Sequence, residues 1–438
     1  MEDMTDKRRY IYIVLFIIGT FAITNILNFV IVNDYNRYTK AQLKEIYNDT
    51  QYEFVYLGAS HTYRSIDPEI VEQHTGNNSL NLGTSSQSVK SSYYLLNEYF
   101  KNKSASKIFL EINPIMTSIP KEDELPLSTF IISDYMRVSP NKLEYLYKSL
   151  SYQDWLSEIF PFRREYKSIF KSGFLIDNVK YKLTKDYRHS IPITPDESDE
   201  YYDNRGFVYS TDIYDKTEHY IDKRLNCDIN TETQFYLKKM IQLCNDNSSE
   251  LILFTAPMTD LYIESTAESI NTYNDFENKC NQLAKENNVK YQDFNIISDQ
   301  YLSLDNSCFK DSNHLNGKGA EIFTKCFVDY FISGNITDSN FYNSWTEKVA
   351  TKEDIFGLYI NSEDQGNKIS LEIDTIQNAG LSMEYEIILM GNDGVERKVS
   401  DYSHKKTYTL TRDAGYIIKV NARPVGQSQP TNTVFKEL

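Results

Sequence analysis

A serine, an aspartate and a histidine stand at positions whose types and spacing could support acyl transfer. Ser60 follows a short apolar run in Gly58-Ala59-Ser60-His61, and Asp311 and His314 lie three residues apart in a polar loop. An imidazole can take the proton of a serine hydroxyl and return it to a leaving group, while a carboxylate fixes its tautomer. We therefore expect a triad of Ser60, His314 and Asp311. Taken singly, each motif has a plain alternative, an inert turn or a capping Asp beside a surface His.

Short apolar runs alternate with amphipathic stretches and would position these residues. The runs predict five strands, at residues 53–57, 79–82, 107–112, 250–255 and 289–294. Helices are expected from Pro68, over 88–100, over about 264–287 and after Gly319. This pattern is typical of an α/β fold with a parallel sheet covered by helices, in which ligands bind at the carboxyl ends of the strands.

Four sequence blocks in this order resemble the SGNH/GDSL hydrolase superfamily. They are Ser60 after the first strand, Asn81-Leu82-Gly83-Thr84 after the second, the block from Ile108 to Pro114, and Asp311-Ser312-Asn313-His314 before the last helix. The resemblance covers roughly residues 51–331, apart from an insertion. It implies a three-layer α/β/α domain, with the oxyanion held by the backbone N–H groups of Ser60 and Gly83 and by the side chain of Asn113.

The departures from the family pattern carry information of their own. Ala59 and His61 replace the Asp and Leu of Gly-Asp-Ser-Leu, and Glu111 and Pro114 replace a Gly and an Asp in the third block. The chain looks closer to the membrane-anchored branch that transfers acyl groups to cell-surface polymers, as in alginate acetylation and teichoic-acid D-alanylation. Glu111 beside Asn113 weakens the oxyanion assignment of Asn113. The candidate substrate contacts are His61, Arg64, Gln87 and Glu111, with local structural roles as the alternative.

The N-terminal region predicts a membrane anchor. Residues 10–32 contain no charged side chain, and about 20 apolar residues span a bilayer as a helix. Lys7, Arg8 and Arg9 precede this stretch, which favours a cytoplasmic N-terminus at 1–9 and an extracytoplasmic catalytic domain. A cleaved signal peptide is the alternative.

The rest of the chain divides into segments of different composition. We expect a stalk at 33–48, a catalytic domain at 49–334 with a largely helical cap inserted at 114–249, a polar linker at 335–346, and a small β-sandwich at 347–438. Period-two patterning predicts the sandwich, with a hairpin turn at Asn392-Asp393-Gly394. Its aromatic residues are candidates either for a sugar platform or for the core: Trp345, Tyr359, Tyr385 and Tyr402.

Charge and cysteine content exclude several classes of function. The chain has 438 residues, 46 Lys+Arg and 62 Asp+Glu, a net charge of −16 that disfavours nucleic-acid binding. Its five cysteines, at 227, 244, 280, 308 and 326, show no metal-ligand spacing, so we expect core cysteines with room for one disulfide, and no metal site or cofactor. The acidic runs at 196–203 and 212–215 are expected to be solvated surface.

These observations together favour an extracytoplasmic serine O-acyltransferase. The resemblance implies O-acetylation of an exopolysaccharide or wall glycan, with the acyl group supplied by a multipass membrane acyltransferase of the MBOAT type. A cell-surface carbohydrate esterase or deacetylase would use the same residues with water as acceptor. A third hypothesis is a glycan-binding or assembly scaffold with a degenerate site.

Overall fold

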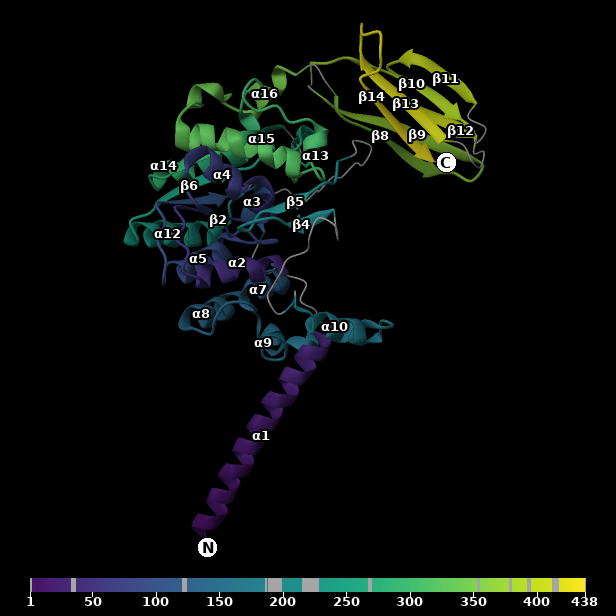
Figure 1. The fold of residues 1–438 in the computed structure, drawn as a ribbon. Helices are drawn as coiled ribbons and strands as arrows, with labels where there is room; N and C mark the ends of the chain where they lie inside the picture. Colours follow the sequence, from purple (N-terminus) through teal and green to yellow (C-terminus); the bar gives the residue numbers. More distant parts are fainter. Residues whose placement is uncertain are drawn as a thin grey trace.

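The computed structural model describes residues 2–32, 37–119, 124–185, 187, 199–214, 228–266, 270–352, 355–377, 380–391, 395–411 and 417–437. Figure 1 shows a protruding N-terminal helix, a central domain built on a sheet, and a separate β domain that carries the C-terminus. The predicted α/β class, the N-terminal apolar helix and the C-terminal β-sandwich are all confirmed by this arrangement.

The central sheet has five parallel strands in the order β2-β1-β3-β6-β7. The strands are β1 (Phe54–Leu57), β2 (Ser79–Asn81), β3 (Lys107–Glu111), β6 (Glu250–Thr255) and β7 (Lys290–Asp293). Each of the five predicted strands is therefore present. Every residue of β1 and β2 is buried, as expected of a parallel sheet covered on both faces.

Helices cover both faces of this sheet and complete three layers. Helices α5 (Val89–Tyr99) and α12 (Thr231–Asp246) lie on one face, and α4 (Pro68–Thr75), α14 (Ile270–Glu286) and α15 (Gly317–Val328) lie on the other (Figure 1). Their starts follow the capping residues that the sequence offers. Ser88 accepts a hydrogen bond from Ser91 N, and Asp67 accepts one from Glu69 N just after Pro68.

The segment predicted as a stalk belongs to the central domain over most of its length. Helix α2 (Arg37–Tyr47) buries Leu43 and Ile46 in the core, and its Gln42 donates a 2.7 Å hydrogen bond from Nε2 to Gly83 O. The prediction of a stalk at 33–48 is thus corrected here, because one apolar face of α2 packs on the domain.

The insertion at 114–249 is mostly helical but does not form one cap over the sheet edge. It contains α6 (Pro114–Ser118), α7 (Pro126–Ser133), α8 (Pro140–Ser149), α9 (Tyr152–Ile159), η2 (Pro161–Arg163), η3 (Tyr166–Phe170), α10 (Phe174–Lys182) and a hairpin of β4 (Glu200–Tyr202) and β5 (Val208–Ser210). Helices α7 and α8 pack on α5, η2 and α10 contact α1, and α12 is a flanking helix of the sheet. Among the described parts of the insertion, strand β5 of the hairpin contacts α3 near the predicted site.

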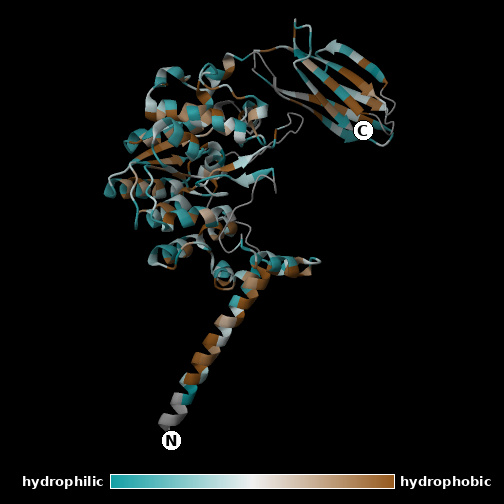
Figure 2. Ribbon diagram, in the orientation of Figure 1, coloured by the Kyte–Doolittle hydropathy of each residue, from teal (hydrophilic) through white to brown (hydrophobic). Residues whose placement is uncertain are grey.

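Helix α1 (Glu2–Ile31) is the feature predicted as a membrane anchor. Within it, residues Arg8–Ile31 form a helix of 24 residues that is long and apolar enough to cross a membrane, with none of its most apolar part buried against the protein. Figure 2 shows α1 coloured as hydrophobic along most of its length.

The C-terminal domain is a sandwich of two antiparallel sheets. One contains β11 (Glu396–Ser403), β10 (Met383–Met390), β13 (Ile417–Pro424) and β14 (Asn432–Glu437), and the other contains β12 (Thr407–Thr411), β9 (Lys368–Gln377) and β8 (Ile355–Asp364). Apolar residues from both sheets form its core. The predicted turn at Asn392-Asp393-Gly394 lies outside the described residues.

Two predictions around the domain boundary need correction. Trp345 is fully buried, stacks edge-on against Tyr273, and begins α16 (Trp345–Ala350), which packs on α14. The expected linker at 335–346 is therefore attached to the α/β domain. Trp345 and Tyr385 are buried, and Arg423 stacks on Tyr402 at 3.6 Å from its ring centre, so these three residues do not form the predicted sugar platform. The side chain of Tyr359 lies outside the described ones.

Candidate active site

A tight turn presents Ser60 at the carboxyl end of β1. Gly58 has a φ of +139°, and a Cβ placed on it would lie 2.3 Å from Thr62 Oγ1 and 2.9 Å from Glu111 Cβ, so only glycine fits. The chain then enters α3 (Ser60–Ser65), whose first residue is Ser60 itself. The hydroxyl of Ser60 is therefore held at the strand end, where it is half-buried.

The loop before α15 brings a histidine and an aspartate to this serine. His314 Nε2 lies 2.7 Å from Ser60 Oγ, and His314 Nδ1 lies 2.9 Å and 3.0 Å from the two carboxylate oxygens of Asp311. The three predicted catalytic side chains thus form one continuous hydrogen-bonded chain, although Ser60 and His314 are 254 positions apart in the sequence. With Nδ1–H donating to the carboxylate, Nε2 is left to accept the serine proton.

Hydrogen bonds from two other segments hold this loop. Thr259, after β6, donates from Oγ1 to Ser312 O at 2.6 Å, and Lys310 N donates to His314 O at 2.8 Å. Asn316 caps α15 by accepting from Gly319 N at 3.0 Å. The position of His314 is consequently fixed by the sheet edge and by α15. Thr259 and Asn316 were not anticipated, and no spacing in the sequence singles them out.

The carboxylate of Asp311 is stabilised in its charged form. Burial raises the pKa of Asp311, but hydrogen bonds from the His314 ring and from the backbone N–H groups of Asn313 and His314, with the charge of His314, outweigh burial and lower that pKa to about 2. Asp311 therefore remains ionised over the working range of pH, as a group that orients an imidazole must.

The three predicted oxyanion donors differ in how they are engaged. Ser60 is the first residue of α3, so its N–H has no acceptor within that helix. Gly83 N instead donates to Asn81 Oδ1 at 3.0 Å, and Asn113 Nδ2 lies 3.1 Å and 3.2 Å from the Glu111 carboxyl oxygens. Gly83 and Asn113 were expected to be free to bind an oxyanion. The structure differs here, because the side chains of Asn81 and Glu111 already accept their hydrogen bonds.

A buried polar chain lies directly behind His314. His61 stacks on His314 with ring centres 4.7 Å apart, and its Nδ1 lies 3.3 Å from Asn113 Nδ2, which also donates to Glu111. Burial and the nearby His314 lower the pKa of His61 to about 3. Burial raises the pKa of Glu111 to about 8, against the opposing hydrogen bonds from Asn113 and Ala59 N. His61 is thus neutral and Glu111 largely protonated near neutral pH.

Arg64 and Gln87, predicted as substrate contacts, are buried in internal networks. Arg64 pairs with Glu200 of the β4–β5 hairpin at 2.7 Å, and Gln87 bridges Thr84 Oγ1 and Ser92 Oγ at 2.9 Å each. Glu200 also binds Lys310, which contacts Asp212 at 3.1 Å. Both acidic residues were expected on solvated surface. The structure corrects this for Glu200, which Arg64 and Lys310 reach from distant segments, whereas the side chain of Asp212 is 44% exposed.

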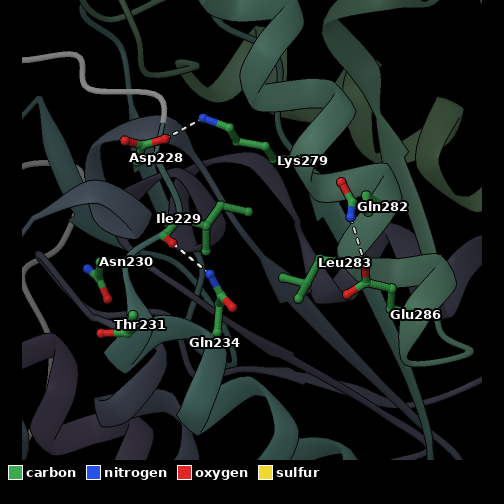
Figure 3. Close-up of a pocket in the computed structure, with 9 residues that line it drawn as sticks. All are labelled: Asp228, Ile229, Asn230, Thr231, Gln234, Lys279, Gln282, Leu283 and Glu286. Carbon is green, nitrogen blue, oxygen red and sulfur yellow. Dashed lines mark hydrogen bonds and ion pairs between the residues drawn. The ribbon is translucent and has the colours of Figure 1, made fainter.

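Two of the described cavities lie away from this site. One, of about 390 Å³, opens between the start of α12 and α14 (Figure 3), where Lys279 pairs with Asp228 and Gln282 with Glu286. None of the predicted site residues lines it. Four cysteines are buried, namely Cys244, Cys280, Cys308 and Cys326, and Cys227 lies outside the described residues.

Comparisons with known proteins add little beyond this geometry. No protein-family model matches the chain, and no curated protein matches it. Among solved structures, a GDSL-like lipase from Bacteroides thetaiotaomicron VPI-5482 has 12% identity and a TM-score of 0.33, covering 69% of this chain and 100% of its own. A protein from Desulfitobacterium hafniense DCB-2 assigned to the lipolytic G-D-S-L family has 12% identity and a TM-score of 0.31, covering 63% and 96%.

Proposed function

We propose that this chain is a membrane-anchored serine O-acyltransferase of the SGNH/GDSL hydrolase superfamily, which O-acetylates an exopolysaccharide or wall glycan outside the cytoplasm. The observation that carries the proposal is the hydrogen-bonded series Ser60–His314–Asp311 at the carboxyl end of β1. The order of the four sequence blocks supports the superfamily. The apolar helix α1 supports anchorage, with the acyl donor supplied by an MBOAT-type membrane partner.

The chemistry follows from the two hydrogen bonds of His314. As Ser60 Oγ attacks the acyl carbon of the donor, its proton passes to His314 Nε2, and the same proton then goes to the leaving group. The acyl group is now an ester on Ser60. A sugar hydroxyl next gives its proton to His314 and attacks that ester, which releases the acylated sugar and restores the Ser60 hydroxyl. Asp311 stabilises the imidazolium in both steps.

Stabilisation of the oxyanion uses the N–H of Ser60 first. The N–H of Gly83 and the amide of Asn113 join it when their present acceptors, Asn81 and Glu111, give way or share the hydrogen bond. One lost oxyanion donor is worth about 10²–10³ in rate, so this rearrangement would have a large effect on activity.

The test uses the full chain in detergent, because α2 is part of the folded domain. The protein is incubated with an activated acetyl ester, with and without neutral oligosaccharides, and mass spectrometry follows both protein and sugar. We expect acetyl on Ser60 that moves to a sugar hydroxyl. It should be absent from Ser60→Ala and present in Ser128→Ala, a matched change at a half-buried serine of α7.

Other results would redirect or overturn the proposal. Acetate release that ignores the sugar would favour the esterase, in which water is the acceptor. Full activity in Ser60→Ala would refute both enzymatic hypotheses and leave the scaffold.

A further inference from the structure

The carbonyl end of the apolar helix α1 is held by side chains of the insertion. Lys182 on α10 donates from Nζ to Asn28 O at 3.1 Å, to Phe29 O at 2.9 Å and to Val32 O. Asn178, one turn earlier, donates to Val30 O at 2.9 Å and to Val32 O at 3.0 Å. The last carbonyl groups of a helix have no partner within it, and a cation near them is favourable. The insertion therefore caps α1 at the predicted membrane exit.

The insertion also contacts α1 before the C-terminal end of that helix, within its apolar stretch. Phe162 N, in η2, donates a 3.0 Å hydrogen bond to Asn28 Oδ1, and Asn28 lies one turn inside the apolar stretch. A cavity of about 370 Å³ beside α1 is lined by Asn25, Asn28 and Phe29 of the helix together with Pro161 and Arg164 of the insertion. Segment 161–170 thus lies beside the last turns of α1, at their level along the helix axis.

The chemistry of this segment differs from that of the rest of the chain. Residues 161–185 contain seven Lys/Arg and two acidic residues, in a chain whose net charge is −16. Around η3, Phe170 is 81% exposed and Tyr166 is 53% exposed. The basic neighbours Arg163, Lys167 and Lys171 are exposed as well. Exposed aromatic and basic side chains together are typical of segments that lie in the headgroup layer of a bilayer.

We infer that η2 and η3, residues 161–171, rest in the headgroup layer of the bilayer that α1 spans, with Phe170 and Tyr166 against the acyl boundary and the basic residues on lipid phosphates. The inference rests on the proposed anchorage by α1. The membrane is chosen as the occupant because the hydrogen bond from Phe162 to Asn28 places the segment at the depth of the last turn of the span. A protein partner at this place would have to displace lipid.

The test measures the depth of nitroxide labels on the full chain in vesicles of phosphatidylcholine with phosphatidylglycerol. Cys227 is first replaced by Ser, and the four described cysteines are buried. Single labels are then placed by Phe170→Cys, by Phe16→Cys in the middle of α1, and by Phe435→Cys on β14 as a matched exposed aromatic. Accessibility to oxygen and to a water-soluble nickel complex gives the depth of each label.

We expect the label at 16 to be deep, the label at 170 to lie at headgroup depth, and the label at 435 to be in water. Lys167→Glu with Lys171→Glu should move the label at 170 towards water. A label at 170 as accessible to nickel as that at 435 would overturn the inference, and would leave a protein partner to cover Phe170. A label at 16 in water would instead refute the anchorage itself, so the two failures are distinguishable.

Discussion

The Glu111→Gln variant should become more stable than the native protein as the pH rises, because the substitution removes a pH-dependent loss of stability. Glu111 is 3% exposed at the end of the central strand β3, and burial raises the pKa of its carboxyl from 4.5 to about 8. Between these values the unfolded chain has released a proton that the folded chain keeps, so stability falls with rising pH, by up to about 1.4 kcal/mol per pH unit. Gln has no proton to release and keeps one oxygen that can accept from Ala59 N and Asn113.

The size of the effect follows from the two pKa values. Between about pH 5 and about pH 8, the native protein should lose about 3–4 kcal/mol of stability relative to Glu111→Gln. The assay is urea unfolding at several pH values, followed by tryptophan fluorescence, since Trp345 is buried against the α/β domain. Glu286→Gln, at an exposed position of α14, is the matched control. If the free energies of unfolding of the native protein and of Glu111→Gln changed with pH in parallel, the inference that Glu111 is protonated in the folded state would be refuted.

Three further predictions concern the site. Asp311→Asn should slow acyl-enzyme formation by a factor of about 10⁴, because an amide favours the wrong tautomer of His314. Rapid-quench mass spectrometry measures this rate, and a decrease of less than about tenfold would contradict the triad. His61→Phe keeps a ring against His314 but loses the hydrogen bond from Asn113, so the rate should fall by about three- to tenfold. Because the pKa of His61 is about 3, the pH–rate profile of His61→Phe above pH 5 should have the same shape as that of the native protein. A shift of the low-pH side of the profile would count against a positioning role for His61. Gly58→Ala should lower stability by about 3 kcal/mol or more in thermal unfolding. Gly76→Ala should lower it less, because Gly76 has a φ of +72° but nothing lies within 4 Å of its added Cβ. Equal effects of the two substitutions would show that the turn at Gly58 is not constrained.

The sheet and its strand ends are the part of the molecule that sequence patterns predict well. Apolar runs of strand length, separated by capped helices, are local signals, and the five strands appear where these runs lie. The contact between Ser60 and His314 was predictable because parallel strands gather their carboxyl ends at one edge, so two motifs far apart in sequence must meet there.

The remaining features depend on pairings that no local pattern records. Glu200 stands in an acidic run that resembles solvated surface, but Arg64 and Lys310 reach it from other elements. In the same way, Gly83 N bonds to the side chain of Asn81, two residues earlier, and only the backbone path shows this. Helix α2 was not predicted as part of the domain. Its apolar stripe is short, and the surface on which it packs is formed by other segments of the chain.

The attachment of α10 to the end of α1 has a mechanical consequence. A catalytic domain on a loose tether sweeps a broad volume and meets substrates in any orientation. Here Asn178 and Lys182 fasten the domain to the helix by five hydrogen bonds, so in a membrane the serine would work at one height and one tilt. Encounter with the surface polymer proposed as acceptor would then be a search in two dimensions. Its rate should follow the surface density of the polymer and not its concentration in the surrounding fluid.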